Sequence, residues 1–143
     1  MPLLTLSTNV SFDDVDVSSI LSQLNSTIAN ILGYPQSYVT VSLEGPIAIS
    51  FGGTEEAAAY GEFVAIGILN PELNKKLSAE IALVLHTLLA VPKSRFFLKF
   101  NDIEGYNCGL NGGIMGLILA PTTGFCLNNH CFGCYNPIVR KEN

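Results

Sequence analysis

The sequence predicts an α+β fold made of two copies of a β-α-β unit, with two helices on one face of a four-stranded mixed sheet. Three observations support this fold class. Short apolar segments of strand character alternate with two long amphipathic segments of helical period. The second half of the chain repeats the first at a constant offset. The length of 143 residues suits one domain with one core.

The first unit begins with an apolar segment, residues 3–8, that predicts a buried strand. An acidic turn at residues 12–14 precedes a predicted helix that ends at Gly33. Its apolar residues share one helical face: Ile20, Leu21, Leu24, Ile28, Ile31 and Leu32. Residues 38–43 alternate as in a half-buried strand. We expect residues 47–51 to add a short edge strand.

The second unit becomes visible when residues 32–37, Leu-Gly-Tyr-Pro-Gln-Ser, are aligned with residues 89–94, Leu-Ala-Val-Pro-Lys-Ser. The offset is 89 − 32 = 57 residues. The same offset pairs four apolar helical positions: Ile20 with Leu77, Leu24 with Ile81, Ile28 with Leu85, and Ile31 with Leu88. Residues 60–66 take the place of the first strand, and residues 96–100 form the closing strand. Between them Asn70 is a predicted helix cap, with proline and an acidic residue following it.

The topology leaves one face of the sheet without a cover. Right-handed crossovers put both helices on the same face. Hydrophobic residues make up 48% of the chain and charged residues only 13%. We therefore expect the second face to be apolar and to be buried by other copies of the chain, which predicts an oligomer.

The charge and the termini narrow the classes of partner. A formal net charge of −5 argues against nucleic acid and anionic membranes, both of which favour basic patches. The apolar stretch at residues 114–120 is far too short to span a bilayer. The first residues lack the basic start and apolar run of a signal peptide. We expect a cytoplasmic protein, with secretion without a leader as the alternative.

Pro2 is a candidate catalytic base. A small second residue favours removal of Met1, which would leave Pro2 with a free secondary amine at the head of an apolar strand. A terminal amino group titrates at about 7.7–8.0, and burial lowers that value because it disfavours the charged form. The result would be a general base near neutral pH. The alternative is that Pro2 is only a common second residue.

Several motifs together resemble the macrophage migration inhibitory factor family of the tautomerase superfamily, and its plant-type branch most closely. They are Pro-Leu-Leu-Thr-Leu-Ser-Thr-Asn-Val at residues 2–10, Ser-Phe-Gly-Gly-Thr-Glu-Glu at 50–56, Ala-Ile-Gly at 65–67 and Arg-Phe-Phe-Leu-Lys-Phe at 95–100. The resemblance implies a homotrimer with three pockets at subunit boundaries. It also implies that an N-terminal proline catalyses keto-enol tautomerisation of phenylpyruvate-like acids or dopachrome, with no metal or organic cofactor.

The resemblance assigns a site in which some positions are kept and others differ. It places the base at Pro2 and a pocket backbone position at Ile66, and both are kept. The family lysine that binds the substrate carboxylate corresponds to Tyr34, so a charge-assisted hydrogen bond of roughly 1.5–3 kcal/mol is missing there. The tyrosine donated by a neighbouring subunit corresponds to Phe97, which lacks the hydroxyl, and the asparagine two residues later to Lys99.

Three of these substitutions allow more than one interpretation. Lys99 either restores an anion-binding cation from the opposite wall or points its ammonium group to solvent. Tyr34 either borders the pocket or only packs on the helix end. The tryptophan that walls the family pocket corresponds to Leu110, which weakens stacking on an aromatic substrate.

The resemblance ends at residue 112, so we predict a tautomerase-like domain at residues 1–112 and a tail at 113–143 that is poorly ordered. The tail contains Cys126, His130, Cys131 and Cys134, with the C-x₄-C-x₂-C spacing of plant-type iron-sulfur proteins. Those proteins place a fourth cysteine downstream, whereas Cys108 lies upstream. We therefore predict no metal site, with zinc binding or a redox dithiol as alternatives. Such a tail could also disturb trimerisation.

Two functions follow from these residues. The first is a tautomerase in which Pro2 moves the proton while Lys99 and the Ile66 backbone bind an aromatic keto or enol acid. We expect weak or absent activity, because Tyr34 and Phe97 lack the family's lysine and hydroxyl. The second is a trimer that turns over little and acts by binding a receptor or another protein partner.

Overall fold

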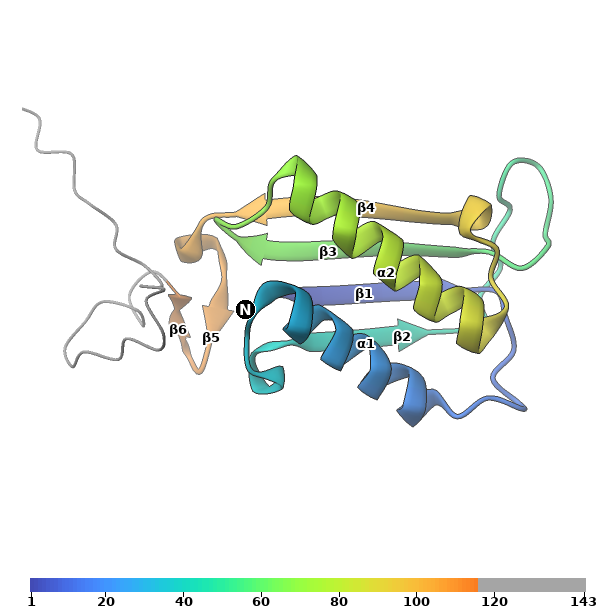
Figure 1. Cartoon of the computed structure of the whole chain (residues 1–143), viewed down its shortest axis with the longest axis horizontal. Helices are drawn as coiled ribbons and strands as arrows, with labels where there is room; N and C mark the ends of the chain where they lie inside the picture. Colours follow the sequence, from blue (N-terminus) through green and yellow to red (C-terminus); the bar gives the residue numbers. More distant parts are fainter. Residues whose placement is uncertain (116–143) are drawn as a thin grey trace, which may run out of the picture. The chain divides into compact units, whose positions relative to one another are not determined.

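The computed structural model describes residues 1–115, which fall into two units, Met1–Ile103 and a second unit that begins at Glu104. The elements of the first unit are β1 (Leu3–Thr8), α1 (Val17–Leu32), β2 (Thr40–Glu44), β3 (Ala59–Ile66), α2 (Pro71–Leu89) and β4 (Phe96–Ile103). The four strands form one sheet in the order β2-β1-β3-β4, parallel within each β-α-β unit and antiparallel between the units. Both helices cross the same face of this sheet (Figure 1). The predicted fold class is confirmed.

The duplication is present in the strand register as well as in the sequence. Leu3 in β1 lies opposite Thr40 in β2, and Ala59 in β3 lies opposite Phe96 in β4. Both pairs are 37 residues apart, since 40 − 3 = 37 and 96 − 59 = 37. Each helix is also followed by a three-residue 3-10 turn, at Gln36–Tyr38 and at Lys93–Arg95. The two halves are therefore equivalent in three dimensions.

Both helices begin at a side-chain cap. The Asp16 carboxylate accepts a hydrogen bond from the Ser19 backbone N–H at 3.1 Å at the start of α1. The Asn70 side-chain oxygen accepts one from the Leu73 backbone N–H at 2.9 Å at the start of α2, where Pro71 is the first helical residue. These caps pair amide groups that the first turn of a helix leaves without partners. The predicted cap at Asn70 is confirmed.

The hydrophobic core lies between the two helices and the sheet. Three of the four predicted helical pairs are fully buried in it: Ile20 with Leu77, Leu24 with Ile81, and Ile28 with Leu85. The fourth pair, Ile31 with Leu88, packs at the margin of the core. From the sheet Leu4, Leu6 and Phe63 complete it. Each such buried side chain contributes about 1.5–3 kcal/mol.

Two strand predictions need correction, one of them a whole strand and the other the start of a strand. Residues 47–51 form no strand within the described part of the chain, where the Ile47 N–H donates to the Thr8 carbonyl at 2.9 Å and Phe51 makes only an isolated bridge with Thr54. Pro46 has no N–H to donate, and a strand also needs a neighbour along its length. The strand predicted for residues 38–43 begins at Thr40, because a 3-10 turn occupies the preceding residues.

The sheet face away from the helices is not apolar, contrary to the prediction. No element of Met1–Ile103 covers this face, which we call the open face. Alternate residues of the four strands point toward it: Leu3, Thr5, Ser7, Thr40, Ser42, Glu44, Tyr60, Glu62, Val64, Ile66, Phe97, Lys99, Asn101 and Ile103. Apolar and aromatic groups there alternate with hydroxyl and charged groups. Burial of this face alone therefore no longer argues for an oligomer, because part of it is compatible with water.

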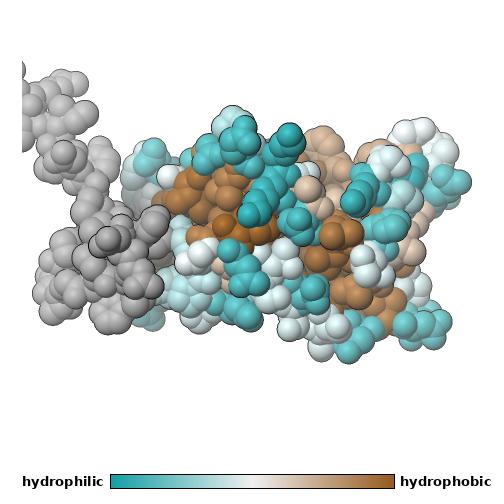
Figure 2. Space-filling model, viewed as in Figure 1, coloured by the Kyte–Doolittle hydropathy of each residue, from teal (hydrophilic) through white to brown (hydrophobic). Residues whose placement is uncertain are grey.

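The helical side of the molecule shows apolar patches that hydrophilic side chains interrupt (Figure 2). Scattered apolar groups of this kind are normal on protein surfaces. Within residues 1–115, neither helix is long and apolar enough to cross a membrane.

The second unit contains a small hairpin that the sequence analysis did not predict. Strands β5 (Gly109–Leu110) and β6 (Gly113–Ile114) pair in antiparallel fashion. The turn between them consists of Asn111 and Gly112, both with positive φ, of 53° and 74°. An Asn-Gly pair with this geometry is the preferred two-residue hairpin turn. Most of the cysteines considered above, Cys126, Cys131 and Cys134, lie outside the described residues, as does His130.

Candidate functional site

Pro2 lies at the start of β1 and is fully buried. Its carbonyl accepts a hydrogen bond from the Thr40 backbone N–H at 3.0 Å, which fixes the end of β1 against β2. On the other side β1 pairs with β3, where Leu3 lies opposite Val64. Continued by one residue, this antiparallel register puts Pro2 opposite Ala65 and next to Ile66. The structure thus brings two of the predicted site residues, Pro2 and Ile66, to one end of the sheet.

The nitrogen of Pro2 is part of a peptide bond as long as Met1 precedes it. An amide nitrogen is not basic, so proton transfer at this atom requires the processed chain. Once freed, the secondary amine would belong to a residue that is fully buried. Burial disfavours the charged form of an amine and lowers its pKa.

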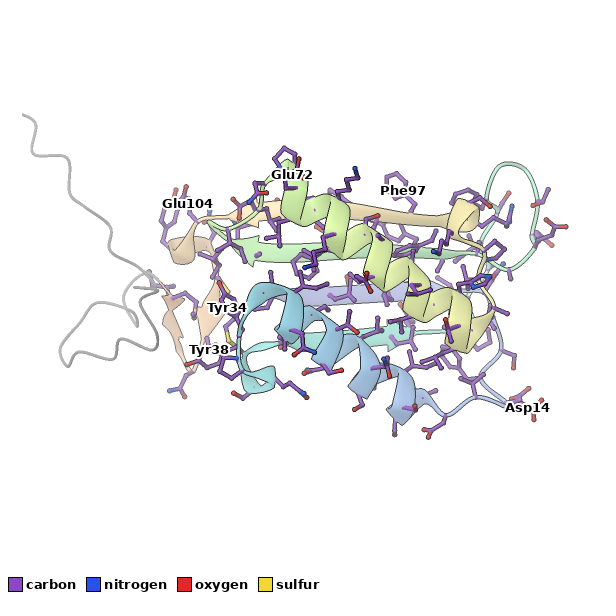
Figure 3. The ribbon with its side chains drawn as sticks, in the orientation of Figure 1. Asp14, Tyr34, Tyr38, Glu72, Phe97 and Glu104 are labelled. Atoms are coloured by element: carbon purple, nitrogen blue, oxygen red, sulfur yellow. The ribbon has the colours of Figure 1, made fainter. Side chains whose placement is uncertain are left out.

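Tyr34 follows the end of α1 directly. Its backbone N–H donates to the Ala29 carbonyl at 3.0 Å, and Gly33 ends the helix in the left-handed conformation, with φ of 70°. The ring of Tyr34 lies edge-on to that of Tyr38, with 6.5 Å between the ring centroids (Figure 3). Burial raises the pKa of Tyr34 above its ordinary value of 10.0. Its hydroxyl is therefore neutral at physiological pH and cannot replace a cation.

Phe97 and Lys99 lie on the open face, Phe97 near the other end of the sheet and Lys99 level with Thr5 in the middle of β1. Phe97 is 56% exposed and stacks on Tyr60, with 5.9 Å between the ring centroids and 13° between the planes. Tyr60 lies opposite Ser7, five residues along β1 from Pro2. At about 3.3 Å per residue, Phe97 and Pro2 of one chain are separated by about 17 Å along the strands. One chain therefore does not bring Phe97 to Pro2.

Leu110 belongs to the second unit. Its side chain is 40% exposed at the turn end of the β5-β6 hairpin. Cys108, just ahead of β5, is a half-buried free thiol. The backbone carbonyl of Cys108 accepts a hydrogen bond from the Met115 N–H at 2.9 Å, which closes the base of the hairpin.

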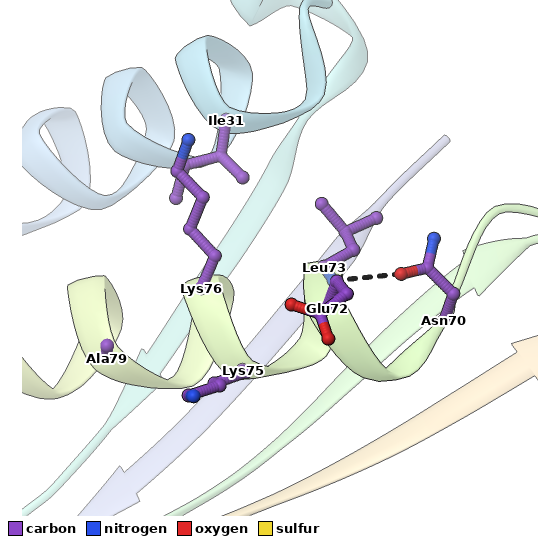
Figure 4. A pocket seen from close by; sticks show the side chains of 7 residues that line it. All are labelled: Ile31, Asn70, Glu72, Leu73, Lys75, Lys76 and Ala79. Carbon is purple, nitrogen blue, oxygen red and sulfur yellow. Dashed lines mark hydrogen bonds between the residues drawn. The ribbon is translucent and has the colours of Figure 1, made fainter.

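A shallow depression lies between the end of α1 and the first turns of α2 (Figure 4). Apolar, charged and amide side chains line it: Ile31, Leu73, Ala79, Asn70, Glu72, Lys75 and Lys76. None of the predicted site residues lines it. The depression is therefore separate from the predicted site, and we assign it no role in the chemistry.

The match to known proteins extends over most of the chain. Residues 1–116 match the family described as "Macrophage migration inhibitory factor (MIF)". The chain belongs to the macrophage migration inhibitory factor (MIF) family. The resemblance inferred from the motifs is thus confirmed.

Individual MIF relatives agree in sequence and fold. The MIF homolog of Trichinella spiralis is 38% identical over 112 residues, which are 78% of this chain and 97% of the relative. The Xenopus laevis protein named D-dopachrome decarboxylase-B is 29% identical over 116 residues, 80% of this chain and 98% of the relative. The crystal structure of a Prochlorococcus marinus MIF homologue superimposes with a TM-score of 0.76 at 29% identity, covering 80% of this chain and 99% of that one.

The structure of this MIF-family chain also shows two features that the sequence analysis missed. Glu62 lies directly opposite Lys99 on the open face. The pairing of Glu62 with Lys99 agrees with the repeat, because residues 37 positions apart pair within each unit, and 62 + 37 = 99. The second feature is Arg95, whose guanidinium group donates hydrogen bonds to four backbone carbonyls in residues 51–57.

Proposed function

We propose that this MIF-family chain catalyses keto-enol tautomerisation of phenylpyruvate-like or dopachrome-like acids, with the processed Pro2 as the base. The burial of Pro2 at the end of the sheet next to Ile66 is the observation that carries the proposal. The name of the relative D-dopachrome decarboxylase-B supports a dopachrome-like substrate. No organic cofactor or metal is needed, because the reaction only moves a proton.

The proposed reaction is a balanced proton transfer. The neutral nitrogen of Pro2 removes a proton from the carbon next to the substrate carbonyl, and the electron pair of that C–H bond forms the enol double bond. The π electrons of the carbonyl move to its oxygen, which receives a proton from the protonated Pro2 nitrogen directly or through water, so that the base is regenerated and no atom is gained or lost. Lys99 and the Ile66 backbone bind the acid, while Tyr34, Phe97 and Leu110 border it.

We further propose a homotrimer in which each site is shared between copies. The separation of about 17 Å between Pro2 and Phe97 within one chain supports this, because a second copy is needed to bring Phe97 to Pro2. The segment at residues 47–50 forms no ladder with another strand of Met1–Ile103, so it is open to pairing with a neighbouring copy. In this proposal residues 1–112 form the tautomerase-like domain of a cytoplasmic protein, and residues 113–143 are an addition to it.

The direct test is turnover of 4-hydroxyphenylpyruvate by the processed protein, with Pro2→Gly as the variant. Intact mass must first show that Met1 is absent from both proteins, and sizing must show the same oligomer. We expect slow turnover in the parent and none in Pro2→Gly. Equal turnover in both would contradict the role of Pro2. Fast turnover in the parent would contradict the importance given to the missing lysine and hydroxyl.

A second candidate is a trimer that binds a receptor or another protein partner and turns over little or no substrate. The neutral hydroxyl of Tyr34 favours this candidate for phenylpyruvate, because it cannot hold the carboxylate as a cation would. A protein that forms the trimer, binds the acid and fails to convert it would support this second function over the first.

A further inference from the structure

The open face carries two cross-strand pairs next to each other on β3 and β4. Tyr60 stacks on Phe97, and two residues further along each strand Glu62 lies opposite Lys99. In a ladder, directly opposite residues have Cβ atoms about 4.5–5.5 Å apart. An aromatic pair is thus followed along the sheet by an acidic and a basic residue at opposite positions of the ladder.

Lys99 has a single acidic neighbour on the open face of Met1–Ile103. Its neighbours along β4 are Phe97 and Asn101, which are uncharged. Across from it lies Glu62, whose other cross-strand neighbour, in β1, is the neutral Thr5. Any anion that approaches the ammonium group of Lys99 from this face therefore also approaches the carboxylate of Glu62.

We propose that Glu62 tunes the charge selectivity of the site, because its carboxylate weakens the binding of anionic aromatic keto or enol acids relative to analogues with an uncharged or zwitterionic head. This inference rests on the proposed function, since it takes Lys99 as the group that meets the polar head of the substrate. A unit charge about 6 Å from a carboxylate, at the effective dielectric constants of a protein surface, changes affinity by about three- to ten-fold.

Binding of 4-hydroxyphenylpyruvate and of its methyl ester tests the proposal. The ester keeps the ring and the ketone but lacks the negative charge. We expect Glu62→Gln to raise the acid-to-ester affinity ratio by about three- to ten-fold, and Glu62→Asp to keep the parent ratio. The affinities are measured by calorimetry, with kcat/KM ratios for the two compounds measured alongside where the protein turns them over.

Glu44→Gln is the matched control, because Glu44 lies on the same face but on β2, at the opposite edge of the sheet from Lys99. It removes the same charge from the protein and should change the ratio less than two-fold. In a Lys99→Gln background, Glu62→Gln should have little further effect, which would show that the two groups act together.

The outcomes separate this inference from the proposed function. An unchanged ratio in Glu62→Gln, or an equal rise in Glu44→Gln, would overturn the role of Glu62 while leaving Pro2 as the base. Activity that survives Pro2→Gly would overturn the proposed chemistry, yet the binding ratio would still decide the role of Glu62. A parent protein that binds neither the acid nor the ester would overturn both.

Discussion

Gly33 and Ala90 end the two helices in the same left-handed conformation, with φ of 70° and 55°, although only Gly33 lacks a side chain. The two residues are 57 positions apart, which is the offset of the internal repeat. Left-handed backbone is costly for a residue with a Cβ atom, by roughly 1–2 kcal/mol. The second repeat therefore keeps a strained helix end that the first repeat avoids.

We predict that Ala90→Gly raises the free energy of unfolding by about 0.5–1 kcal/mol, because glycine removes the strain at this helix end. Gly33→Ala is the matched variant. A Cβ atom there would meet nothing within 4 Å, so the variant should lose about 1 kcal/mol through strain alone. Urea unfolding of the three proteins measures both changes. A less stable Ala90→Gly would show that the two helix ends are not equivalent.

We predict that the hydrogen bonds of Arg95 stabilise the loop at residues 51–57. Its Nε and Nη1 atoms donate to the Ala57 and Phe51 carbonyls, both at 3.0 Å, and Nη2 donates to the Thr54 and Glu56 carbonyls at 3.3 and 3.1 Å. Lysine keeps the charge but not the planar set of donors, so Arg95→Lys should cost about 2 kcal/mol of stability.

The Arg95→Lys variant should also be cleaved faster by proteases within residues 51–57 than the parent. Lys93→Ala provides the control, since Lys93 is exposed in the same 3-10 turn. It should change neither stability nor cleavage appreciably. Cleavage of the Arg95→Lys loop at the parent rate would mean that other contacts hold it.

Tyr34 should make the protein less stable at alkaline pH. Its pKa is raised by burial in the folded state, while the unfolded chain loses the proton near pH 10. The unfolded state then binds fewer protons than the folded state, so stability falls as the pH rises above about 10. Tyr34→Phe should weaken this fall, whereas Tyr106→Phe, at an exposed tyrosine, should not. If the free energy of unfolding falls equally with pH in the parent and in Tyr34→Phe, Tyr34 does not cause the loss of stability at alkaline pH.

Tyr34→Lys should raise kcat/KM for 4-hydroxyphenylpyruvate by about 10- to 100-fold. The lysine would supply a charge-assisted hydrogen bond of roughly 1.5–3 kcal/mol to the substrate carboxylate. Tyr34→Phe controls for loss of the hydroxyl, and thermal unfolding controls for damage to the fold. If Tyr34→Lys folds and shows no gain, the limiting defect lies at Phe97 or in the tail.

The repeat and its helical faces could be predicted from the sequence because each depends on local period and on the matched 57-residue spacing. The polarity of the open face was not predicted correctly. The prediction used the hydrophobic content of the whole chain instead of the residues at the strand positions that face this side. Thr5, Ser42 and Lys99 occupy alternate strand positions. Which face of the sheet these positions point to depends on the pairing register of the strands. The predicted edge strand at residues 47–51 failed because a strand also depends on a partner. The Asn111-Gly112 hairpin was overlooked although its turn signal is strong.

For the candidate site, the two strands next to Pro2 and around Ile66 could be recognised from the sequence, and the structure brings both residues to one end of the sheet. Their separation from Phe97 follows from strand direction and register, which only the structure supplies. The pairing of Glu62 with Lys99 likewise depends on strand register. Local patterns thus located the proposed base, while the arrangement around it depended on long-range pairing.

The pKa of the Pro2 nitrogen in the processed protein tests the central proposal most directly. Proline labelled with ¹⁵N allows that single nitrogen to be titrated by NMR, once intact mass has shown that Met1 is absent. We predict a pKa below the usual range of about 7.7–8.0, because Pro2 is fully buried and burial disfavours the charged form of an amine. A pKa within or above that range would contradict the account of Pro2 as a base active at neutral pH.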